Sequence, residues 1–271
     1  MKVILLAGGR GTRAMPFSLY SPKSMIPING RPVIDHITRY LAKFSIVESF
    51  IIVCEFDHLG KQIVNYFEGK EHIMGKKIIF VEDAKNGTGG AILSAESLVK
   101  DDDFFVVWFA DNLCAVDVDD FIRQYKFQES MKENDHSKFI GIIATRGHRK
   151  EETGIVVLDP KEKPRIKEFV EKPTLKLELP ETLGIYLFSK NLLNFIHMQK
   201  EASTLGDAFD LSYEVLAQIP RFGSTIFSYS LPSDREWIDI ESPTHAGRNK
   251  DLIEKILSQM NKKNKNSEHN K

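Results

Sequence analysis

Cysteine is scarce in this sequence, with only Cys54 and Cys114 among its 271 residues. Both lie in otherwise apolar surroundings and form no metal-ligand spacing. We therefore expect two buried free thiols, which are typical of a protein in a reducing compartment.

Long apolar runs are also missing. No run approaches the roughly 20 residues that span a bilayer, so we expect no membrane partner. The apolar stretch Val3–Leu6, after Met1 and Lys2, is too short for a signal peptide. We therefore expect a cytoplasmic location.

Neither sign of charge dominates, because 37 Lys and Arg residues face 38 Asp and Glu residues. This balance argues against a general nucleic-acid partner, although it permits a local basic site. With 42% hydrophobic residues the chain can bury a substantial core. We find no internal repeat in the sequence. The sequence leaves open whether the chain forms a homo-oligomer.

Short β-branched runs alternate with amphipathic stretches through the first half, which favours an α/β fold with a mainly parallel sheet and helices on both faces. We expect strands at Val3–Leu6, Phe50–Val53, Lys77–Val81, Phe104–Phe109 and Phe139–Ala144. We expect helices at Val33–Phe44, Leu59–Phe67, Ala91–Val99 and Val118–Lys126. Ligands of such sheets bind beyond the carboxyl ends of the strands.

The pattern changes near Thr153 to closely spaced strands, which indicates a smaller, partly antiparallel lobe able to cover a ligand. These later strands are Gly154–Leu158, Ile166–Val170, Leu183–Phe188 and Thr225–Ser230, with helical patterns at Asp207–Gln218 and Pro243–Met260 around the segment Trp237–Ile240. We expect one domain over residues 1–260, with halves at 1–150 and 151–240 and a C-terminal helix at 241–260. The polar tail Asn261–Lys271 is predicted to be disordered.

The loop after the first expected strand carries three glycines in four positions. Glycine lets backbone N–H groups approach a polyphosphate, and basic side chains add charge-assisted hydrogen bonds. The loop residues are Leu6, Ala7, Gly8, Gly9, Arg10, Gly11, Thr12 and Arg13, with Lys23 following. We interpret the loop as a phosphate cradle, and the alternative is a solvated surface loop.

Two better-known phosphate loops do not fit. The P-loop spacing G-x-x-x-x-G-K-[ST] is absent. The segment from Gly9 to Ala14 matches the dinucleotide fingerprint G-x-G-x-x-A, but that fingerprint must open a helix. Pro16, Pro22 and Pro27 prevent one long helix between Gly11 and Gly30, which disfavours a dehydrogenase.

Two acidic residues are candidate ligands of a hard cation. Asp111 follows the apolar strand Phe104–Phe109, where a carboxylate could hold a cation beside phosphate. Asp239 lies inside an apolar segment, where a buried carboxylate needs a metal or a basic partner. The alternatives are a turn cap for Asp111 and an ordinary ion pair for Asp239.

Two further motifs are weaker. Glu171-Lys172-Pro173 ends a strand, and its two charged side chains point to opposite faces. One can therefore meet a ligand hydroxyl and the other a phosphate; an exposed turn is the alternative.

Gly87 and Thr88 precede a helical pattern, with Thr88 a candidate cap and Glu82 shortly before. A glycine-lined helix N-terminus accepts a flat base or an anion, or it is a plain capping turn.

Taken together, these motifs resemble the sugar-1-phosphate nucleotidylyltransferases, the family that includes glucose-1-phosphate thymidylyltransferase and mannose-1-phosphate guanylyltransferase. The resemblance covers nearly the whole chain. The motifs that carry it are the glycine loop, Pro22–Ile28, Gly30-Arg31-Pro32, Gly87-Thr88, Asp111-Asn112, Glu171-Lys172-Pro173, Gly184-Ile185-Tyr186 and Trp237-Ile238-Asp239. It implies a Rossmann-like three-layer α/β/α fold with a mainly parallel mixed central sheet and a smaller, partly antiparallel sugar-binding lobe.

The resemblance also implies residue roles. Arg13 and Lys23 would hold the phosphates of a nucleoside triphosphate, and Lys172 would contact a sugar 1-phosphate. Asp111 and Asp239 would bind Mg²⁺. Glu82, Gly87 and Thr88 would lie at the nucleotide, and Asn112, Gly154, Glu171 and Gly184 at the sugar.

Three departures from the family pattern concern the substrates. Thr182-Leu183 replaces the usual Asn-Ala before Gly184, Ala110 replaces a frequent glycine, and the usual Pro-Leu is missing before Gly87. Glu82 accepts hydrogen bonds only, so it could pair with the two donors of guanine or the single donor of thymine or uracil, which favours guanine slightly.

The sugar is expected to be glucose or mannose. The alternative function is a regulatory subunit that binds nucleotide sugars without catalysis.

Overall fold

The computed structural model describes residues 1–9, 11–70, 72–132, 138–151, 153–161, 164–202 and 209–262, without the side chains of Arg13, Lys150 and Ala202. Its centre is an eight-stranded sheet in the order β13-β9-β12-β7-β1-β4-β6-β5. The strands are β1 (Lys2–Leu6), β4 (Ser49–Cys54), β5 (His72–Ile73), β6 (Lys76–Glu82), β7 (Phe104–Phe109), β9 (Phe139–Lys150), β12 (Thr174–Ser189) and β13 (Thr225–Ser230).

The sheet is mixed and mainly parallel around β1. Strand β1 pairs in parallel with β4 and β7, β4 pairs in parallel with β6, and β9 pairs in parallel with β13. Strand β12 runs antiparallel between β7 and β9. Every residue of β4 is buried, as expected for a strand covered on both faces.

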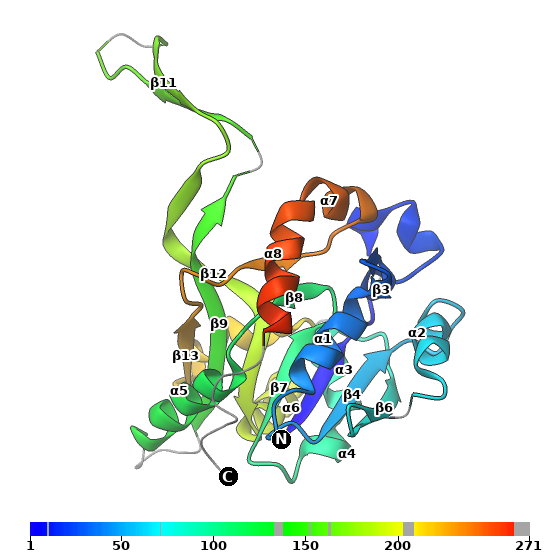
Figure 1. The fold of residues 1–271 in the computed structure, drawn as a ribbon. Helices are drawn as coiled ribbons and strands as arrows, with labels where there is room; N and C mark the ends of the chain where they lie inside the picture. Colours follow the sequence, from blue (N-terminus) through cyan, green and yellow to red (C-terminus); the bar gives the residue numbers. More distant parts are fainter. Residues whose placement is uncertain are drawn as a thin grey trace, which may run out of the picture.

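Helices cover both faces of the sheet and give three layers (Figure 1). The helices are α1 (Val33–Leu41), α2 (Gly60–Phe67), α3 (Gly87–Ser94), α4 (Glu96–Val99), α5 (Val118–Ser130), α6 (Asn191–Ala202), α7 (Pro243–Arg248) and α8 (Lys250–Asn261). Val3 and Leu5 pack into the core beneath α1, α2, α5 and α8, whereas Ile4 packs into a second core beneath α3, α4 and α6. The predicted three-layer α/β/α class is confirmed.

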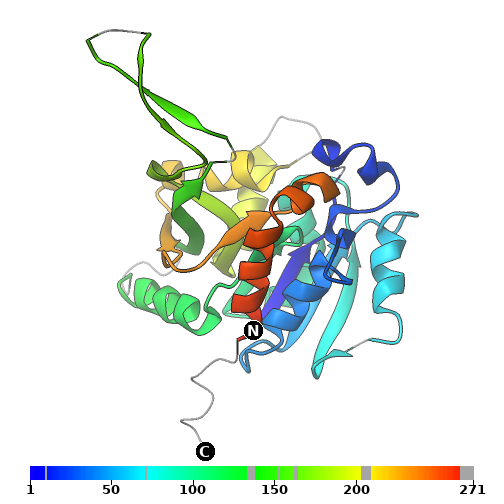
Figure 2. The same ribbon diagram turned by 45° about the horizontal axis from the view of Figure 1, so that its top comes forward.

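An arm projects from the body beside the C-terminal helices (Figures 1 and 2). It consists of the outer ends of β9 and β12 together with the hairpin β10 (Ile155–Leu158) and β11 (Ile166–Val170). Most side chains of the hairpin are exposed. The later part of β12 and all of β13 lie in the central sheet.

Most expected elements are found with shifted ends. Helix α6 was not expected, and β9 and β12 are longer than predicted. Each of the helical patterns Ala91–Val99 and Pro243–Met260 forms two helices, and the pattern at 207–218 is a π-helical turn over Leu211–Leu216. Residues 207–208 and the tail from 263 onward lie outside the described residues.

Cys54 and Cys114 are buried and form no disulfide, as predicted. Burial raises the pKa of each thiol to about 12. None of the described helices is long and apolar enough to cross a bilayer.

Candidate functional site

The glycine loop leaves β1 at the carboxyl edge of the sheet. Ala7 N still donates to Val53 O at 2.9 Å, and after it Gly9 and Gly11 take positive φ values of 108° and 54°. A side chain at Gly11 would lie 3.1 Å from Cβ of Ser18, so this position is also sterically tight. Left-handed backbone of this kind favours glycine.

No long helix follows the loop. Three short 3₁₀ helices, Thr12–Ala14, Phe17–Leu19 and Lys23–Met25, carry the chain to the hairpin β2 (Pro27–Ile28) and β3 (Arg31–Pro32). The prediction made from the prolines is therefore confirmed. This path folds Lys23 back toward the loop, so that both line the same cavity.

Asp111 follows β7 after one residue, Ala110, and β7 is the neighbour of β1 in the sheet. Its Oδ2 lies 3.4 Å from Nζ of Lys23, and the two side chains are only 24% and 17% exposed. The loop after β1 and the end of β7 thus meet through an ion pair, which leaves both charges at the same cavity.

The second acidic residue is brought beside the first by a short sheet. Strand β14 (Trp237–Asp239) pairs antiparallel with β8 (Asn112–Cys114), with Asp239 opposite Asn112. Ile240 N donates to Asp111 O at 2.9 Å. The two carboxylates therefore lie at one end of this pairing, 128 positions apart in the sequence (239 minus 111).

This donor set fits a hard divalent cation. Asp111 and Asp239 both line the cavity, and carboxylate oxygens are the ligands that Mg²⁺ prefers. Within the described part of the chain, no three His, Cys, Asp or Glu side chains gather to hold a metal. A cation here would take its remaining ligands from water and phosphate oxygens, as Mg²⁺ at phosphates usually does.

Part of the cavity wall is formed where the pairing of β12 with β9 is irregular, between Thr182 and Tyr186. Leu183 O accepts two hydrogen bonds of 2.9 Å, from Nδ2 of Asn112 and from Nε1 of Trp237. Gly184 follows with φ of 68°, and a Cβ there would lie 2.2 Å from Nδ2 of Asn112. Only glycine fits this position, and it leaves backbone facing the cavity.

The resulting cavity has a volume of about 490 Å³ and unites much of the predicted site. The predicted residues that line it are Leu6, Ala7, Gly8, Gly9, Gly11, Lys23, Thr88, Asp111, Asn112, Gly184 and Asp239. Thr12 lies in the first 3₁₀ helix without lining the cavity. Arg10 and the side chain of Arg13 lie outside the described part of the chain.

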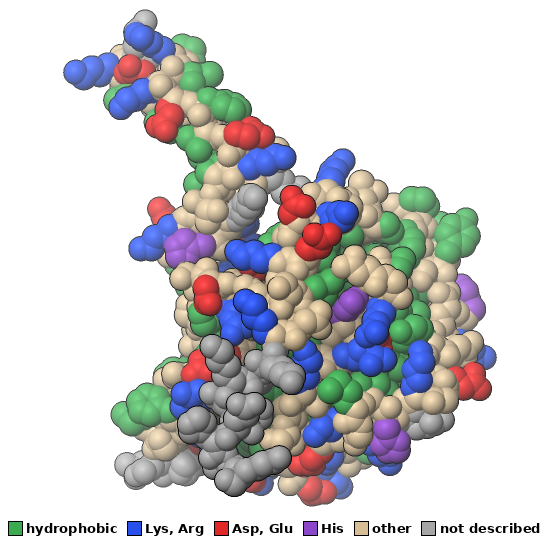
Figure 3. Space-filling view, viewed as in Figure 1, with side chains coloured by type: hydrophobic (Ala, Val, Ile, Leu, Met, Phe, Trp, Pro, Cys, Tyr) green, Lys and Arg blue, Asp and Glu red, His purple; other side chains and the backbone are tan. Residues whose placement is uncertain are grey.

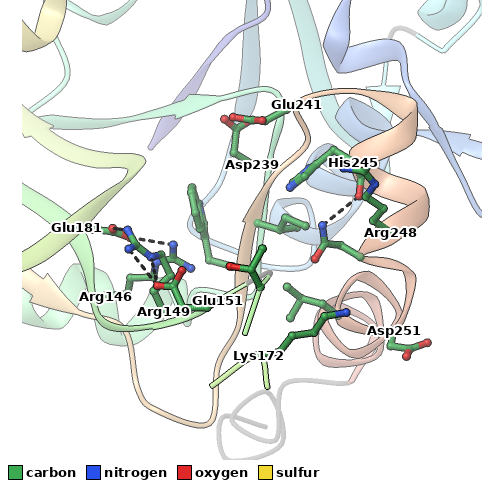
Figure 4. Close-up of a pocket in the computed structure, with 15 residues that line it drawn as sticks. Arg146, Arg149, Glu151, Lys172, Glu181, Asp239, Glu241, His245, Arg248 and Asp251 are labelled. Carbon is green, nitrogen blue, oxygen red and sulfur yellow. Dashed lines mark hydrogen bonds and ion pairs between the residues drawn. The ribbon is translucent and has the colours of Figure 1, made fainter. Parts of the chain in front are cut away.

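A larger cavity of about 1170 Å³ shares Trp237 and Asp239 with the first (Figure 4). It lies between the arm and helices α7 and α8, and Lys172 lines it from the arm. Lys172 has φ of 45°, a left-handed conformation at the bend between β11 and β12. Basic and acidic side chains lie together on this face where the arm leaves the body (Figure 3).

Other predicted sugar contacts remain within the arm. A Cβ at Gly154 would lie 2.4 Å from Cζ of Phe169 and 2.8 Å from Oε2 of Glu171. Gly154 is therefore packed against its own hairpin. Gly154 and Glu171 line neither of the two cavities.

Two of the residues predicted to contact the base, Glu82 and Gly87, lie outside both cavities. Glu82 ends β6 with an exposed side chain. The residue next to Glu82, Asp83, packs over Gly8, where a Cβ would lie 2.3 Å from Oδ2 of Asp83.

The N-terminus of α3 is covered by the protein itself. Phe209 O accepts a hydrogen bond of 2.9 Å from Gly89 N, and a Cβ at Gly87 would lie 2.4 Å from the same oxygen. The prediction that Thr88 caps this helix is wrong, because Asn86 holds the cap position without a side-chain hydrogen bond. The Thr88 hydroxyl instead donates to Asp210 at 3.0 Å and accepts from Leu211 N at 2.8 Å.

Sequence reasoning missed several charged residues on the wall of the larger cavity. Arg146, Arg149 and Glu181 form ion pairs there, and Arg146 also stacks on Trp237. No local motif marks them, because the partners come from β9, β12 and β14, far apart in the sequence.

Comparison with known proteins identifies the family of this chain. The family model described as Nucleotidyl transferase matches residues 2–265, so the chain belongs to the nucleotidyl transferase family. Its resemblance to the sugar-1-phosphate nucleotidyltransferases within that family is confirmed by curated relatives named mannose-1-phosphate guanyltransferase.

Two curated relatives illustrate the similarity. The chain is 32% identical over 201 residues to the bifunctional protein GlmU of Methanocaldococcus jannaschii, covering 74% of this chain and 43% of that protein. It is 28% identical over 246 residues to a mannose-1-phosphate guanyltransferase of Aspergillus oryzae, covering 90% of this chain and 61% of that protein. The chain thus spans less than two thirds of the length of these relatives.

Solved structures show the same fold. A putative glucose-1-phosphate thymidylyltransferase from Bacillus anthracis has a TM-score of 0.62 at 20% identity, covering 96% of this chain and 95% of that one. HddC from Yersinia pseudotuberculosis also has a TM-score of 0.62, at 23% identity, covering 94% and 98%.

Proposed function

We propose that this protein transfers a nucleotidyl group from a nucleoside triphosphate to a sugar 1-phosphate. The products are a nucleoside diphosphate sugar and pyrophosphate. One observation carries the proposal: the glycine loop, Lys23, Asp111 and Asp239 line one cavity, although they come from three separate parts of the chain.

The reaction needs no protein nucleophile. A phosphate oxygen of the sugar 1-phosphate forms the new bond to the α-phosphorus, in line with the bond that breaks. Pyrophosphate leaves with the electron pair of that bond. The barrier comes from repulsion between anions and from charge on the transferring group, so positioning and electrostatics dominate.

The residues divide this work between them. Backbone N–H groups of the glycine loop, with Lys23 and Arg13, hold the triphosphate, while Lys172 holds the sugar phosphate. Asp111 and Asp239 would hold Mg²⁺, and the ion would neutralise phosphate charge. Asn112 positions Leu183 and Gly184, whose backbone faces the sugar.

Guanine is the favoured base and mannose or glucose the favoured sugar. Glu82 offers two acceptor oxygens to the two donors of guanine, against one donor on thymine or uracil. Several relatives carry the name mannose-1-phosphate guanyltransferase, which supports the same choice. Gly154 and Glu171 complete the proposed sugar contacts from the arm.

The test is pyrophosphate release with GTP, dTTP, UTP, ATP and CTP against the 1-phosphates of mannose, glucose, galactose and N-acetylglucosamine, with and without Mg²⁺. We expect release with at least one pair, dependent on both substrates and on Mg²⁺. GTP as the poorest triphosphate would overturn the choice of base. Binding of a nucleotide sugar without release for any pair would instead support the non-catalytic regulatory subunit.

A further inference from the structure

Four charged side chains on the wall of the larger cavity have no part in the reaction described above. Glu181 accepts from Arg146 on Oε2, at 3.0 Å from Nε and 2.8 Å from Nη2. Its other oxygen accepts from Nη1 of Arg149 at 2.6 Å, and Arg149 also donates to Glu151 at 3.1 Å. We call these four residues the Glu181 cluster; Figure 4 shows them on one side of the cavity, opposite His245 and Arg248.

The Glu181 cluster lies where the backbone pairing of the arm is interrupted. Strand β12 pairs with β9 through Lys176 and His148, and next through Glu181 and Arg146. Between these pairs β12 advances five residues (176 to 181) while β9 advances two (146 to 148). An irregularity of this kind bends the strands and breaks the ladder, so the backbone alone does not fix the direction of the arm. Arg146 and Glu181 are register partners on the body side of the interruption. The hydrogen bond from Arg149 to Glu181 crosses it and joins the arm to the body.

Arg146 also contacts the strand that carries Asp239. Its guanidinium lies 4.6 Å from the centre of the Trp237 ring. Trp237 begins β14, two residues before Asp239, and its indole N–H is fixed on Leu183 O at 2.9 Å. Arg146 therefore contacts β14 directly and reaches the arm through Glu181, which also binds Arg149.

The energetics favour a geometric role over a stabilising one. The side chains of Arg146, Glu181 and Arg149 are 21%, 33% and 44% exposed, and ion pairs at such sites contribute little to stability. Both oxygens of Glu181 are nevertheless occupied, and Arg146 combines a two-donor contact with stacking. A planar guanidinium makes both contacts at once, whereas a lysine ammonium does not.

We infer that Arg146 is a positioning residue that, through Glu181 and Arg149, holds the arm, with Lys172, in a fixed relation to Trp237 and Asp239. The inference rests on the proposed function only for its consequence: the sugar phosphate at Lys172 is held against the nucleotide site. The positioning itself concerns residues of this chain alone.

The variant that tests the inference is Arg146→Lys. It keeps the positive charge but loses the two-donor hydrogen bonding to Glu181 and the stacking on Trp237. We expect kcat/KM for the sugar 1-phosphate to fall about tenfold or more, because small misplacements of reacting groups are costly. The KM for the nucleoside triphosphate should stay unchanged, since the glycine loop and Lys23 are untouched. Glu181→Gln should act in the same direction with a smaller effect.

A fluorescence measurement tests the positioning without the reaction. Trp108 is 1% exposed and inaccessible to acrylamide, whereas Trp237 is partly exposed and covered by Arg146. Acrylamide quenching of Trp237 should increase in Arg146→Lys, and its quenching by Mn²⁺ should weaken if Asp239 has moved. Trp237→Phe assigns the signal.

Arg123→Lys is the matched control, because Arg123 forms an exposed pair with Asp120 at 3.2 Å and lines neither cavity. It should behave as wild type in every assay. Wild-type quenching and unchanged kinetics in both Arg146→Lys and Glu181→Gln would overturn the inference. If the wild type has no transferase activity, the proposed function fails, and the quenching results still decide the positioning.

Discussion

The ammonium group of Lys23 lies 3.4 Å from Oδ2 of Asp111, although 88 positions separate the two residues. The pair joins the loop after β1 to the end of β7, its neighbour in the sheet. Each partner holds the other at the cavity before any ligand arrives. In the proposed reaction, the bound ligands would replace this ion pair by two stronger interactions. Lys23 would pair with a phosphate group, and Asp111 would bind the cation.

Lys23→Ala should lower kcat for pyrophosphate release by about a hundredfold or more, because a preorganised cation at the transferring phosphate is lost. The stability should change by less than about 1 kcal/mol, since the Lys23–Asp111 pair is partly exposed and weak. Steady-state kinetics and thermal denaturation measure the two effects.

Lys2→Ala is the matched control for Lys23→Ala. Lys2 starts β1 at the other end of the sheet and pairs with Asp102 at 3.0 Å with similar exposure. It should keep wild-type kcat. Equal losses in the two variants would mean that Lys23 acts only through folding.

Asp239→Asn should raise the Mg²⁺ concentration for half-maximal activity about tenfold or more, because an amide replaces a charged oxygen ligand. A Mg²⁺ titration of initial rates checks this. Glu236→Gln serves as control, because Glu236 pairs with Lys255 at 2.6 Å and does not line the smaller cavity. A Mg²⁺ dependence that is the same in Asp239→Asn and wild type would remove Asp239 from the metal site.

Gly184→Ala should cost more stability than Gly223→Ala. Both glycines have nearly equal φ values, 68° and 72°, so both variants incur the left-handed penalty of about 1–2 kcal/mol. Only at Gly184 does the new Cβ meet Asn112 and Phe109, whereas nothing lies within 4 Å of Gly223. Urea denaturation should show an extra loss of about 1–3 kcal/mol for Gly184→Ala. Equal costs would mean that the crowded wall around Leu183 relaxes freely.

Stability should fall as the pH is lowered through the acid range. Burial alone would raise the pKa of Glu181, but Arg146 and Arg149 outweigh it and hold the pKa below its usual value. A backbone hydrogen bond from Gly60 lowers the pKa of Asp57. Because these pKa values are depressed in the folded state, the stabilisation is present above the unfolded values and is lost as pH falls through the folded ones.

The corresponding measurement is urea denaturation between about pH 6 and pH 3, which spans the usual carboxyl pKa values. The midpoint should decrease toward acid, and Glu181→Gln should show a smaller decrease than wild type. A midpoint that rises on acidification would contradict the assigned pKa directions.

Local patterns predicted the parts of this protein that local physics determines. Continuous apolar runs mark β1 and β7, which are buried on both faces. Glycine marks the loop after β1, and prolines mark the irregular path to Lys23. Asp111 follows a buried strand after one residue, so its position at the edge of the sheet was predictable.

Long-range pairing explains what the sequence did not predict. The Thr88 hydroxyl meets Asp210 across 122 positions, so a helix-capping pattern gave the wrong partner. The length of the arm depends on how β9 pairs with β12, and the contact between Arg146 and Trp237 depends on where β14 docks. Neither is encoded in the periodicity of one segment.

We propose nucleotidyl transfer at the cavity that contains Lys23, Asp111 and Asp239. A ³¹P NMR spectrum of the wild-type protein with the triphosphate and sugar 1-phosphate panel and Mg²⁺ tests it most directly. We expect equal amounts of pyrophosphate and a new nucleoside diphosphate sugar, formed only when both substrates are present. Unchanged triphosphate and sugar phosphate signals for every pair would contradict it.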